Sequence, residues 1–188
     1  MDIYGNRIFT KRLQLRKPEK EDIELLFTWS HSPEAYGKYL SPERLKLEHL
    51  QDQLASGALW NDREKLFLVE LRDTGKPIGT THYWQPPGNN ETVVISLKIA
   101  LPAERNKGYG TELQKFLIIQ LFSHKKIKNI EMYTDINNNG QQRCLRKLGF
   151  ELAKSLTYED QQVQRTGHLF RLTAERYNSE PIYHYHYE

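Results

Sequence analysis

The decisive stretch of the sequence is residues 99–111, which read Ile-Ala-Leu-Pro-Ala-Glu-Arg-Asn-Lys-Gly-Tyr-Gly-Thr. It follows an apolar segment typical of a strand and precedes an apolar segment with helical periodicity. The start of a helix leaves several backbone N–H groups without partners and carries about half a positive charge. Gly108 and Gly110 lack a Cβ atom, so an anion can approach these groups closely. The stretch therefore predicts a phosphate or pyrophosphate site built from main-chain donors, with Arg105 and Lys107 adding positive charge at its mouth.

A plainer interpretation stays open for the same residues, because a Gly-x-Gly after a strand can be no more than a tight turn. Two better-known phosphate motifs are excluded. The pattern GxxxxGK[ST] is absent, and a dinucleotide fingerprint would need a third glycine and a preceding βαβ unit.

Working outward, the pattern alternates between helices and strands. The predicted helices run from Pro18 to about Trp29, from Ser41-Pro42-Glu43 to Gly57, and over residues 111–122 and 140–148. The predicted strands are residues 66–71, 77–84, 92–100, 130–135, 150–158 and 167–173. This order predicts a mixed α/β (α+β) fold in which the front half of the sheet is largely antiparallel.

Composition limits the classes of function. The 188 residues fit one domain, and 27 Lys+Arg against 24 Asp+Glu give a formal charge of +3. That near balance gives no indication of nucleic-acid binding. The single cysteine, Cys144, excludes a disulfide framework and a cysteine metal cluster, and we expect no metal. With no long apolar segment and no secretory signal, we expect a cytoplasmic protein that does not associate with membranes.

Two spaced motifs resemble a known family. Arg105-x-x-Gly108-x-Gly110 matches the acyl-CoA-binding pattern [QR]-x-x-G-x-[GA] of the GNAT superfamily of N-acyltransferases. Residues 138–150 resemble the family's second signature, in which an Asn at a helix start is followed eleven residues later by Gly-Phe. Residues 15–22 and 167–177 are similar to the branch that contains ribosomal-protein N-terminal acetyltransferases and polyamine acetyltransferases. The resemblance covers about residues 10–177 and implies a GNAT-like domain over residues 1–177, followed by a tail at 178–188.

The resemblance implies that acetyl-CoA is the co-substrate and that an amine attacks its thioester directly. Ile99 and Ala100 would bond the pantetheine arm, and the Ala100 amide is the expected oxyanion donor. Asn138 would contact the cofactor or only cap its helix, and the two interpretations stay open. The expected cofactor-binding residues are Ile99, Ala100, Arg105, Asn106, Lys107, Gly108, Tyr109, Gly110, Thr111 and Asn138.

The family's usual catalytic acid has no counterpart in this sequence, and the base is not marked by a motif. Family members often carry Tyr seven residues after the signature Asn or Ser three after it, but here these positions hold Leu145 and Gln141, which cannot donate a proton. His82 and Glu91, near strand ends, are candidate bases, although each is also an ordinary surface residue in type. A set of aromatic residues is expected either to line an acceptor pocket or to belong to the core: Trp29, Tyr36, Tyr39, Tyr83 and Trp84.

We therefore predict an N-acetyltransferase that acts on a primary amine, either a protein N-terminus or a small molecule, as a monomer or homodimer. Two alternatives stay open: a catalytically degenerate acyl-CoA-binding regulator, and an interaction module that keeps the fold without the cofactor. Cys144 is expected to be a helix-face hydrophobe without a nucleophilic role. The segment Tyr183-His184-Tyr185-His186-Tyr187 is expected to be a tail without a metal site, because no third ligand can be placed.

Overall fold

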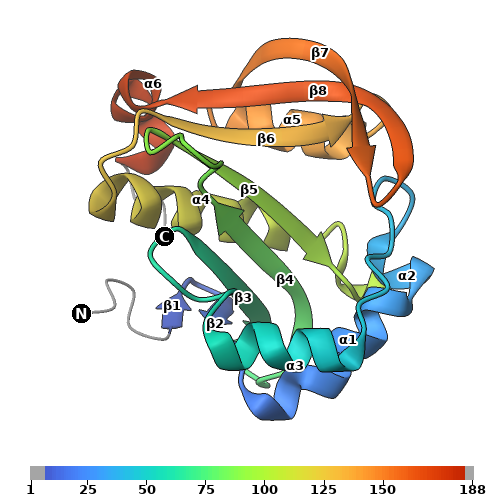
Figure 1. The fold of residues 1–188 in the computed structure, drawn as a ribbon. Coiled ribbons are helices and arrows are strands. Elements are labelled where there is room, and N and C mark those ends of the chain that lie inside the picture. The colour runs from blue at the N-terminus through green and yellow to red at the C-terminus, as the bar shows by residue number, and fades with distance from the viewer. Residues whose placement is uncertain (1–6, 185–188) are drawn as a thin grey trace.

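The computed structural model describes residues 7–184 and contains one eight-stranded sheet with the strand order β1-β2-β3-β4-β5-β6-β8-β7 (Figure 1). The strands are β1 (Arg7–Phe9), β2 (Leu13–Arg16), β3 (Glu64–Leu71), β4 (Pro77–Trp84), β5 (Thr92–Ile99), β6 (Asn129–Asp135), β7 (Glu151–Asp160) and β8 (Val163–Thr173). The helices are α1 (Ile23–His31), α2 (Pro33–Tyr36), α3 (Leu47–Ser56), α4 (Tyr109–His124), α5 (Asn139–Lys147) and α6 (Ala174–Ser179). The expected mixed α/β fold with a mostly antiparallel sheet is confirmed.

One pair of neighbouring strands breaks the antiparallel pattern. β5 and β6 run parallel, and their pairing covers only Thr92–Val94 on β5 and Asn129–Glu131 on β6. Beyond Val94 the two strands diverge, as Figure 1 shows, while β5 stays paired with β4 as far as Ile99. The sheet therefore opens in a V, and the backbone of the second half of β5 forms one edge of that opening.

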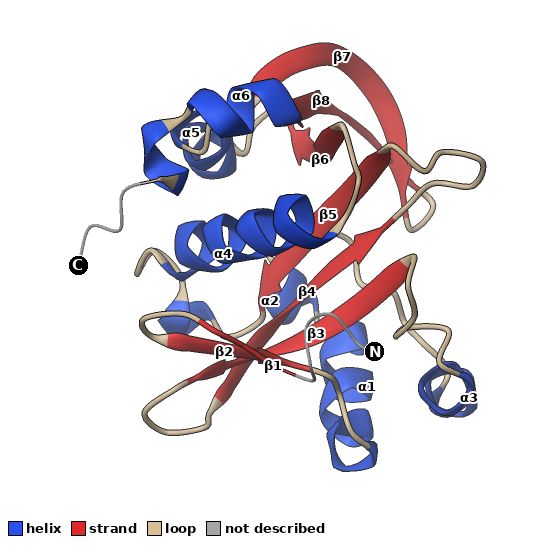
Figure 2. Cartoon of the chain, turned by 90° about the vertical axis from the view of Figure 1, so that its left-hand side faces the viewer, coloured by secondary structure: helices blue, strands red, loops and turns tan. Residues whose placement is uncertain are grey.

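Helices cover both faces of the sheet, with α4 on one face and α1 and α3 on the other (Figure 2). Four apolar residues of α4 are fully buried in the larger core: Leu113, Leu117, Ile118 and Leu121. The second core joins α1 and α3 to the sheet through Leu26, Leu50 and Leu68. Because helices pack on both faces of the sheet, the place where β5 diverges from β6 lies between the two helical layers.

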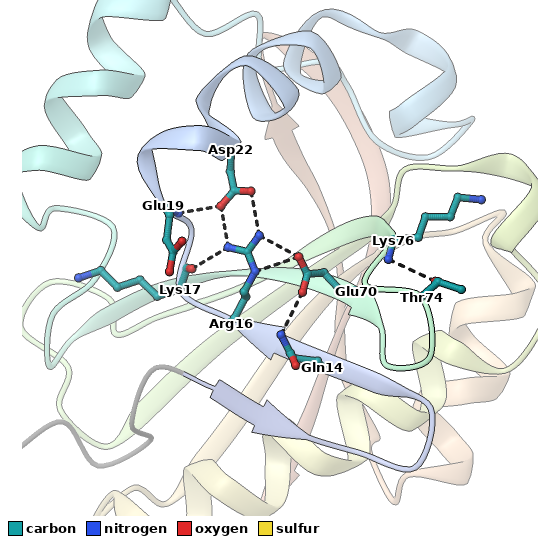
Figure 3. Close-up of polar contacts among 8 residues, drawn as sticks. All are labelled: Gln14, Arg16, Lys17, Glu19, Asp22, Glu70, Thr74 and Lys76. Atoms are coloured by element: carbon teal, nitrogen blue, oxygen red, sulfur yellow. Dashed lines mark hydrogen bonds and ion pairs between the residues drawn. The ribbon is translucent and has the colours of Figure 1, made fainter.

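A charged cluster fixes the start of α1 to the sheet (Figure 3). The Arg16 guanidinium on β2 donates two hydrogen bonds to the Asp22 carboxylate, at 2.7 and 2.9 Å, and one to Glu70 on β3 at 2.9 Å. Asp22 also accepts from the Glu19 N–H at 2.7 Å, and Gln14 donates to Glu70. Although burial raises the pKa of Asp22, these hydrogen bonds outweigh it and lower that pKa.

The prediction that a helix begins at Ser41 is wrong, because the helix in this region, α3, begins at Leu47. The Ser41 N–H instead donates to Asp160 at the end of β7 at 2.7 Å, and the Arg44 N–H donates to the Ser30 carbonyl at 2.8 Å. Arg44 also has a φ of 52°, which no α-helix contains. Contacts with distant parts of the chain thus outweigh a good local helix start.

Four short elements were not expected: β1, β2, α2 and α6. β8 begins at Val163, four residues before its expected start at Gly167. At the C-terminus, Tyr183 is buried and its hydroxyl donates to the Leu148 carbonyl at 2.6 Å, so residues beyond 177 pack on the domain. Tyr185, His186 and Tyr187 lie outside the described residues.

Candidate active site

The loop before α4 has the backbone geometry of an anion site. Gly108 precedes the first residue of α4 with a φ of 82°, and Asn106 has a φ of 60°. The Glu112 N–H makes the first intrahelical bond, to the Gly108 carbonyl at 3.1 Å. The N–H groups of the first turn of a helix have no intrahelical acceptor, so they point out of the end of α4. A positive φ favours glycine, which explains why Gly108 stands at this turn.

These donors face a cavity of about 730 Å³ between α4, α5, α2 and the end of β5. Eight of the ten expected cofactor residues line it: Ile99, Arg105, Asn106, Gly108, Tyr109, Gly110, Thr111 and Asn138. Ala100 and Lys107 are not among the lining residues. The cavity has room for an elongated ligand, and its donors suit the diphosphate of CoA.

The two basic residues of the loop have partners within the protein. The Arg105 guanidinium donates to the Ile99 carbonyl at 2.8 Å and to the carbonyls of Glu34 and Ala35 at 2.6 and 3.2 Å. Lys107 donates to the Glu104 carboxylate at 2.8 Å, which raises the pKa of Lys107. Arg105 therefore ties α2 to the end of β5, and its charge is shared with these carbonyls, which sequence reasoning did not show.

The prediction that the Ala100 N–H is free to act as the oxyanion donor is wrong. The Ala100 N–H donates to the Ile78 carbonyl on β4 at 2.8 Å, so it is not available to a ligand. Antiparallel ladders alternate between residues that bond one neighbour and residues that face the other side. Because Ala100 pairs with β4, the N–H groups of Leu97 and Ile99 point instead toward the V-shaped opening.

The second expected motif lies across the cavity from the loop. Asn138 caps α5, since its side chain accepts from the Gln141 N–H at 3.1 Å, and it also lines the cavity. Gln141 donates to Gln114 of α4 at 2.8 Å, and Leu145 is fully buried. Burial raises the pKa of the Cys144 thiol, which reduces the fraction present as the nucleophilic thiolate.

A second cavity, of about 540 Å³, lies on the other face of the sheet. His82 of β4 lines it, and its Nε2 is 2.8 Å from the Glu64 carboxylate of β3. Glu43 and Asp160 place two further carboxylates at the wall of this cavity. An imidazole can accept a proton, and the structure places the imidazole of His82 at the wall of this cavity, beside Glu64.

A largely buried ionic contact joins two residues at the wall of this second cavity, Ser41 and Asp160. The Arg165 guanidinium donates to Asp160 at 2.8 Å and to the Ser41 hydroxyl at 3.0 Å, and it lies 3.4 Å from Asp135. The Arg165 side chain is 13% exposed. The β7–β8 hairpin and the loop before α3 are thus joined beside the cavity.

The remaining candidates are divided between site and core. Glu91 is exposed at the start of β5, pairs with Lys128 at 2.6 Å, and lines neither cavity. Trp29 and Tyr83 are buried in the two cores. The other three aromatic residues line the cavities. Tyr39 lines the cavity beside the start of α4, Trp84 lines the second cavity beside His82, and Tyr36 lines both.

The two cavities meet. Tyr36, Leu40, Leu97 and Lys98 line both of them, at the level where β5 has diverged from β6. A ligand held by its phosphates at the start of α4 can therefore reach through the V-shaped opening to an acceptor beside His82. This arrangement defines an acyl-CoA-dependent N-acyltransferase.

The comparison with protein families agrees with this class. The Acetyltransferase (GNAT) domain model matches residues 12–151, and the chain belongs to this family of acetyl-CoA-dependent enzymes. The resemblance seen in the two motifs is confirmed.

Similar proteins of known sequence include the aminoglycoside N(6')-acetyltransferases type 1 of Klebsiella pneumoniae and Serratia marcescens. Each is 25% identical over 159 residues, which cover 78% of this chain and 77% of the relative.

Solved structures share the fold. A GNAT-family acetyltransferase from Bacillus anthracis superposes with a TM-score of 0.72 at 19% identity, covering 90% of this chain and 99% of the other. RimL, the ribosomal L7/L12 α-N-protein acetyltransferase solved with coenzyme A, gives 0.75 at 13% identity with the same coverage. The aminoglycoside acetyltransferase AAC(6')-Ib, solved with coenzyme A and kanamycin, gives 0.69 at 21% identity, again with this coverage.

Two features are absent from residues 7–184, the part of the chain that the structure describes. No helix there is long and apolar enough to cross a membrane. In the same residues, no group of three or more His, Cys, Asp and Glu side chains is arranged to hold a metal ion.

Proposed function

We propose that this acetyltransferase binds the diphosphate of acetyl-CoA on the backbone N–H groups of residues 106–111 and transfers the acetyl group to a small amine that carries several positive charges. The observation that carries the proposal is the junction of the two cavities at Tyr36, Leu40, Leu97 and Lys98. One cavity supplies anion-binding donors, and the other supplies carboxylates and a proton acceptor.

The chemistry begins with loss of a proton from the acceptor. A primary amine of the lysine type has a pKa of about 10.4, so it is largely protonated at pH 7 and cannot attack until it is neutral. His82, held by Glu64, would take this proton. The neutral amine then attacks the thioester carbon, and negative charge develops on the carbonyl oxygen.

The backbone of β5 would stabilise that negative charge. Its exposed N–H groups at Leu97 and Ile99 lie beside the opening, on a strand that β4 holds in place. Fixed donors of this kind need no reorganisation when charge develops, and each is typically worth about 10²–10³ in rate. The unpaired N–H groups are therefore those of Ile99 and Leu97, one and three positions before Ala100, the residue expected from the sequence.

The acceptor class follows from the second cavity. Its volume of about 540 Å³ suits a small molecule, and Glu43, Glu64 and Asp160 stand on three different segments around it. Several carboxylates facing one space favour a ligand with more than one ammonium group. The similarity to aminoglycoside N(6')-acetyltransferases supports an acceptor of this kind.

Thiol release from acetyl-CoA tests the proposal. The assay compares aminoglycosides and polyamines with monoamines and with peptides that have free N-termini. We expect the multiply charged small amines to give the highest kcat/KM, and Glu43→Gln to raise their KM while leaving CoA affinity unchanged. A preference for peptide N-termini would contradict the proposed acceptor.

Two other outcomes would select the remaining alternatives. Tight CoA binding without turnover on any amine would identify an acyl-CoA-binding regulator, and a melting temperature unaffected by CoA would identify an interaction module. The cytoplasmic location and the monomeric or homodimeric state stay predictions.

A further inference from the structure

The departing thiolate has no proton donor at the two positions where the family's motif usually supplies one. Leu145 occupies the first and is fully buried in the core. Gln141 occupies the second, and its amide already donates to Gln114 at 2.8 Å. Some other group near the junction of the two cavities must supply the proton if the enzyme turns over efficiently.

Lys98 occupies that junction. Among residues 7–184 it is the one lysine that lines both cavities. Its register on β5, opposite Thr80, places its side chain on the same face of the sheet as Ser96 and His82. Its Nζ lies 3.8 Å from the centre of the Tyr36 ring, which holds the chain end at the opening.

We infer that Lys98 is the catalytic acid that protonates the CoA sulfur as the carbon–sulfur bond breaks. The inference rests on the proposed function, because it places an acyl thioester at the junction of the two cavities. It also accounts for a lysine among residues that otherwise suit a cationic acceptor.

The surroundings of Lys98 tune it for this role. Burial lowers the pKa of Lys98 to about 8, while the charge of Glu43 opposes that change. An ordinary thiol has a pKa of about 8.5, so the two groups are closely matched, and a matched acid transfers its proton efficiently. The other titratable groups facing this space are Tyr36, His82 with Glu64, and Asp160, which is bonded to Arg165.

Two other groups that line these cavities and carry a transferable proton, Tyr36 and Cys144, are less suitable. The Tyr36 hydroxyl donates to Glu43 at 3.1 Å, and burial raises the pKa of Tyr36. Cys144 lies within 3.1 Å of the Thr111 hydroxyl and within 3.2 Å of the Gln114 amide, and burial raises its pKa as well.

The reaction moves two protons: His82 releases to solvent the one that it took from the acceptor ammonium, and Lys98 handles the other. The acceptor nitrogen forms its bond to the carbonyl carbon and becomes positively charged, and the carbon–sulfur bond then breaks with its electron pair going to sulfur. Lys98 gives one proton to the sulfur and takes one back from the acylated nitrogen. The products are a neutral amide and free CoA thiol, and Lys98 returns to its starting ammonium form.

The test compares three variants in the full-length protein. Lys98→Met removes the proton donor at similar length, whereas Lys98→Arg keeps the charge but holds its proton too tightly to donate it in this pH range. Lys154→Met, at an exposed position on β7, is the matched control. Each is assayed for thiol release at saturating acceptor between pH 6 and 10, with CoA affinity measured by calorimetry.

Both Lys98 variants should lose about 10²-fold in kcat with CoA affinity unchanged, and the control should match the wild type. Wild-type kcat should fall above about pH 8 as Lys98 loses its proton, and this fall should be absent from the residual activity of Lys98→Arg. Wild-type kcat in either Lys98 variant would overturn the inference and leave the proposed function intact. Absence of turnover in the wild type itself would overturn both.

Discussion

Substitution of Gly108 by alanine tests the geometry of the loop before α4. Gly108 has a φ of 82°, a left-handed conformation that costs a residue with a Cβ atom about 1–2 kcal/mol. The new Cβ would also lie 3.4 Å from the Arg12 guanidinium, which holds the Lys107 carbonyl at 2.9 Å. Strain at this point would displace the donors on which the CoA diphosphate is proposed to rest.

The expected effect has two parts that thermal melting separates. A loss of about 1–2 kcal/mol lowers the melting temperature by roughly 2–8 °C for a chain of this size. At 100 times its Kd, CoA stabilises a folded protein by about 2.7 kcal/mol. We expect Gly108→Ala to weaken CoA binding at least tenfold, so the stabilisation at the same CoA concentration falls by about 1.4 kcal/mol.

Gly110→Ala is the matched control. Its Cβ would make ordinary contact with Leu97 at 3.5 Å, its φ is not left-handed, and the family motif accepts alanine here. This variant should bind CoA as the wild type does. If Gly108→Ala melts at a lower temperature yet gains as much stability from CoA as the wild type, the loop geometry does not determine binding and the reasoning fails.

Three further predictions concern the acceptor side and the sheet. His82→Gln should lower kcat about 10²-fold without changing CoA affinity in calorimetry, and an unchanged kcat would exclude His82 as the proton acceptor. Arg165→Met should leave Asp160 without its buried cation, cost about 3 kcal/mol in urea unfolding and raise the acceptor KM, whereas an unchanged KM would show that this contact does not shape the cavity. The lowered pKa of Asp22 means that its contribution is complete at neutral pH and is lost as pH falls below about 4, so Asp22→Asn should flatten the acid limb of stability measured against pH. An acid limb as steep in Asp22→Asn as in the wild type would contradict this.

Much of the fold could be predicted because long elements carry their periodicity in many residues. The buried face of α4 is evident from Leu113, Leu117 and Leu121 alone, and β3 to β5 are apolar runs bounded by turns. β1 and β2 have only three and four residues, too few for a pattern to stand out. The loop after Ser41 could not be predicted, because its conformation depends on hydrogen bonds to Asp160, which is 119 positions away.

The same distinction holds for the candidate site. The Gly108 turn and the Asn138 cap are local features, so residue type and spacing reveal them. The Ala100 N–H is different, because which β5 groups face the opening depends on the register with Ile78 and the rest of β4. Lys98 carried no signal in the sequence, since its role depends on Tyr36 and on the meeting of two cavities that only the folded chain forms.

A crystal structure with coenzyme A tests the central claim most directly. The account predicts diphosphate oxygens about 3 Å from backbone nitrogens of residues 106–111, with the pantetheine arm directed along Leu97 and Ile99 toward Lys98. A diphosphate bound elsewhere, with this loop turned away from it, would contradict the account.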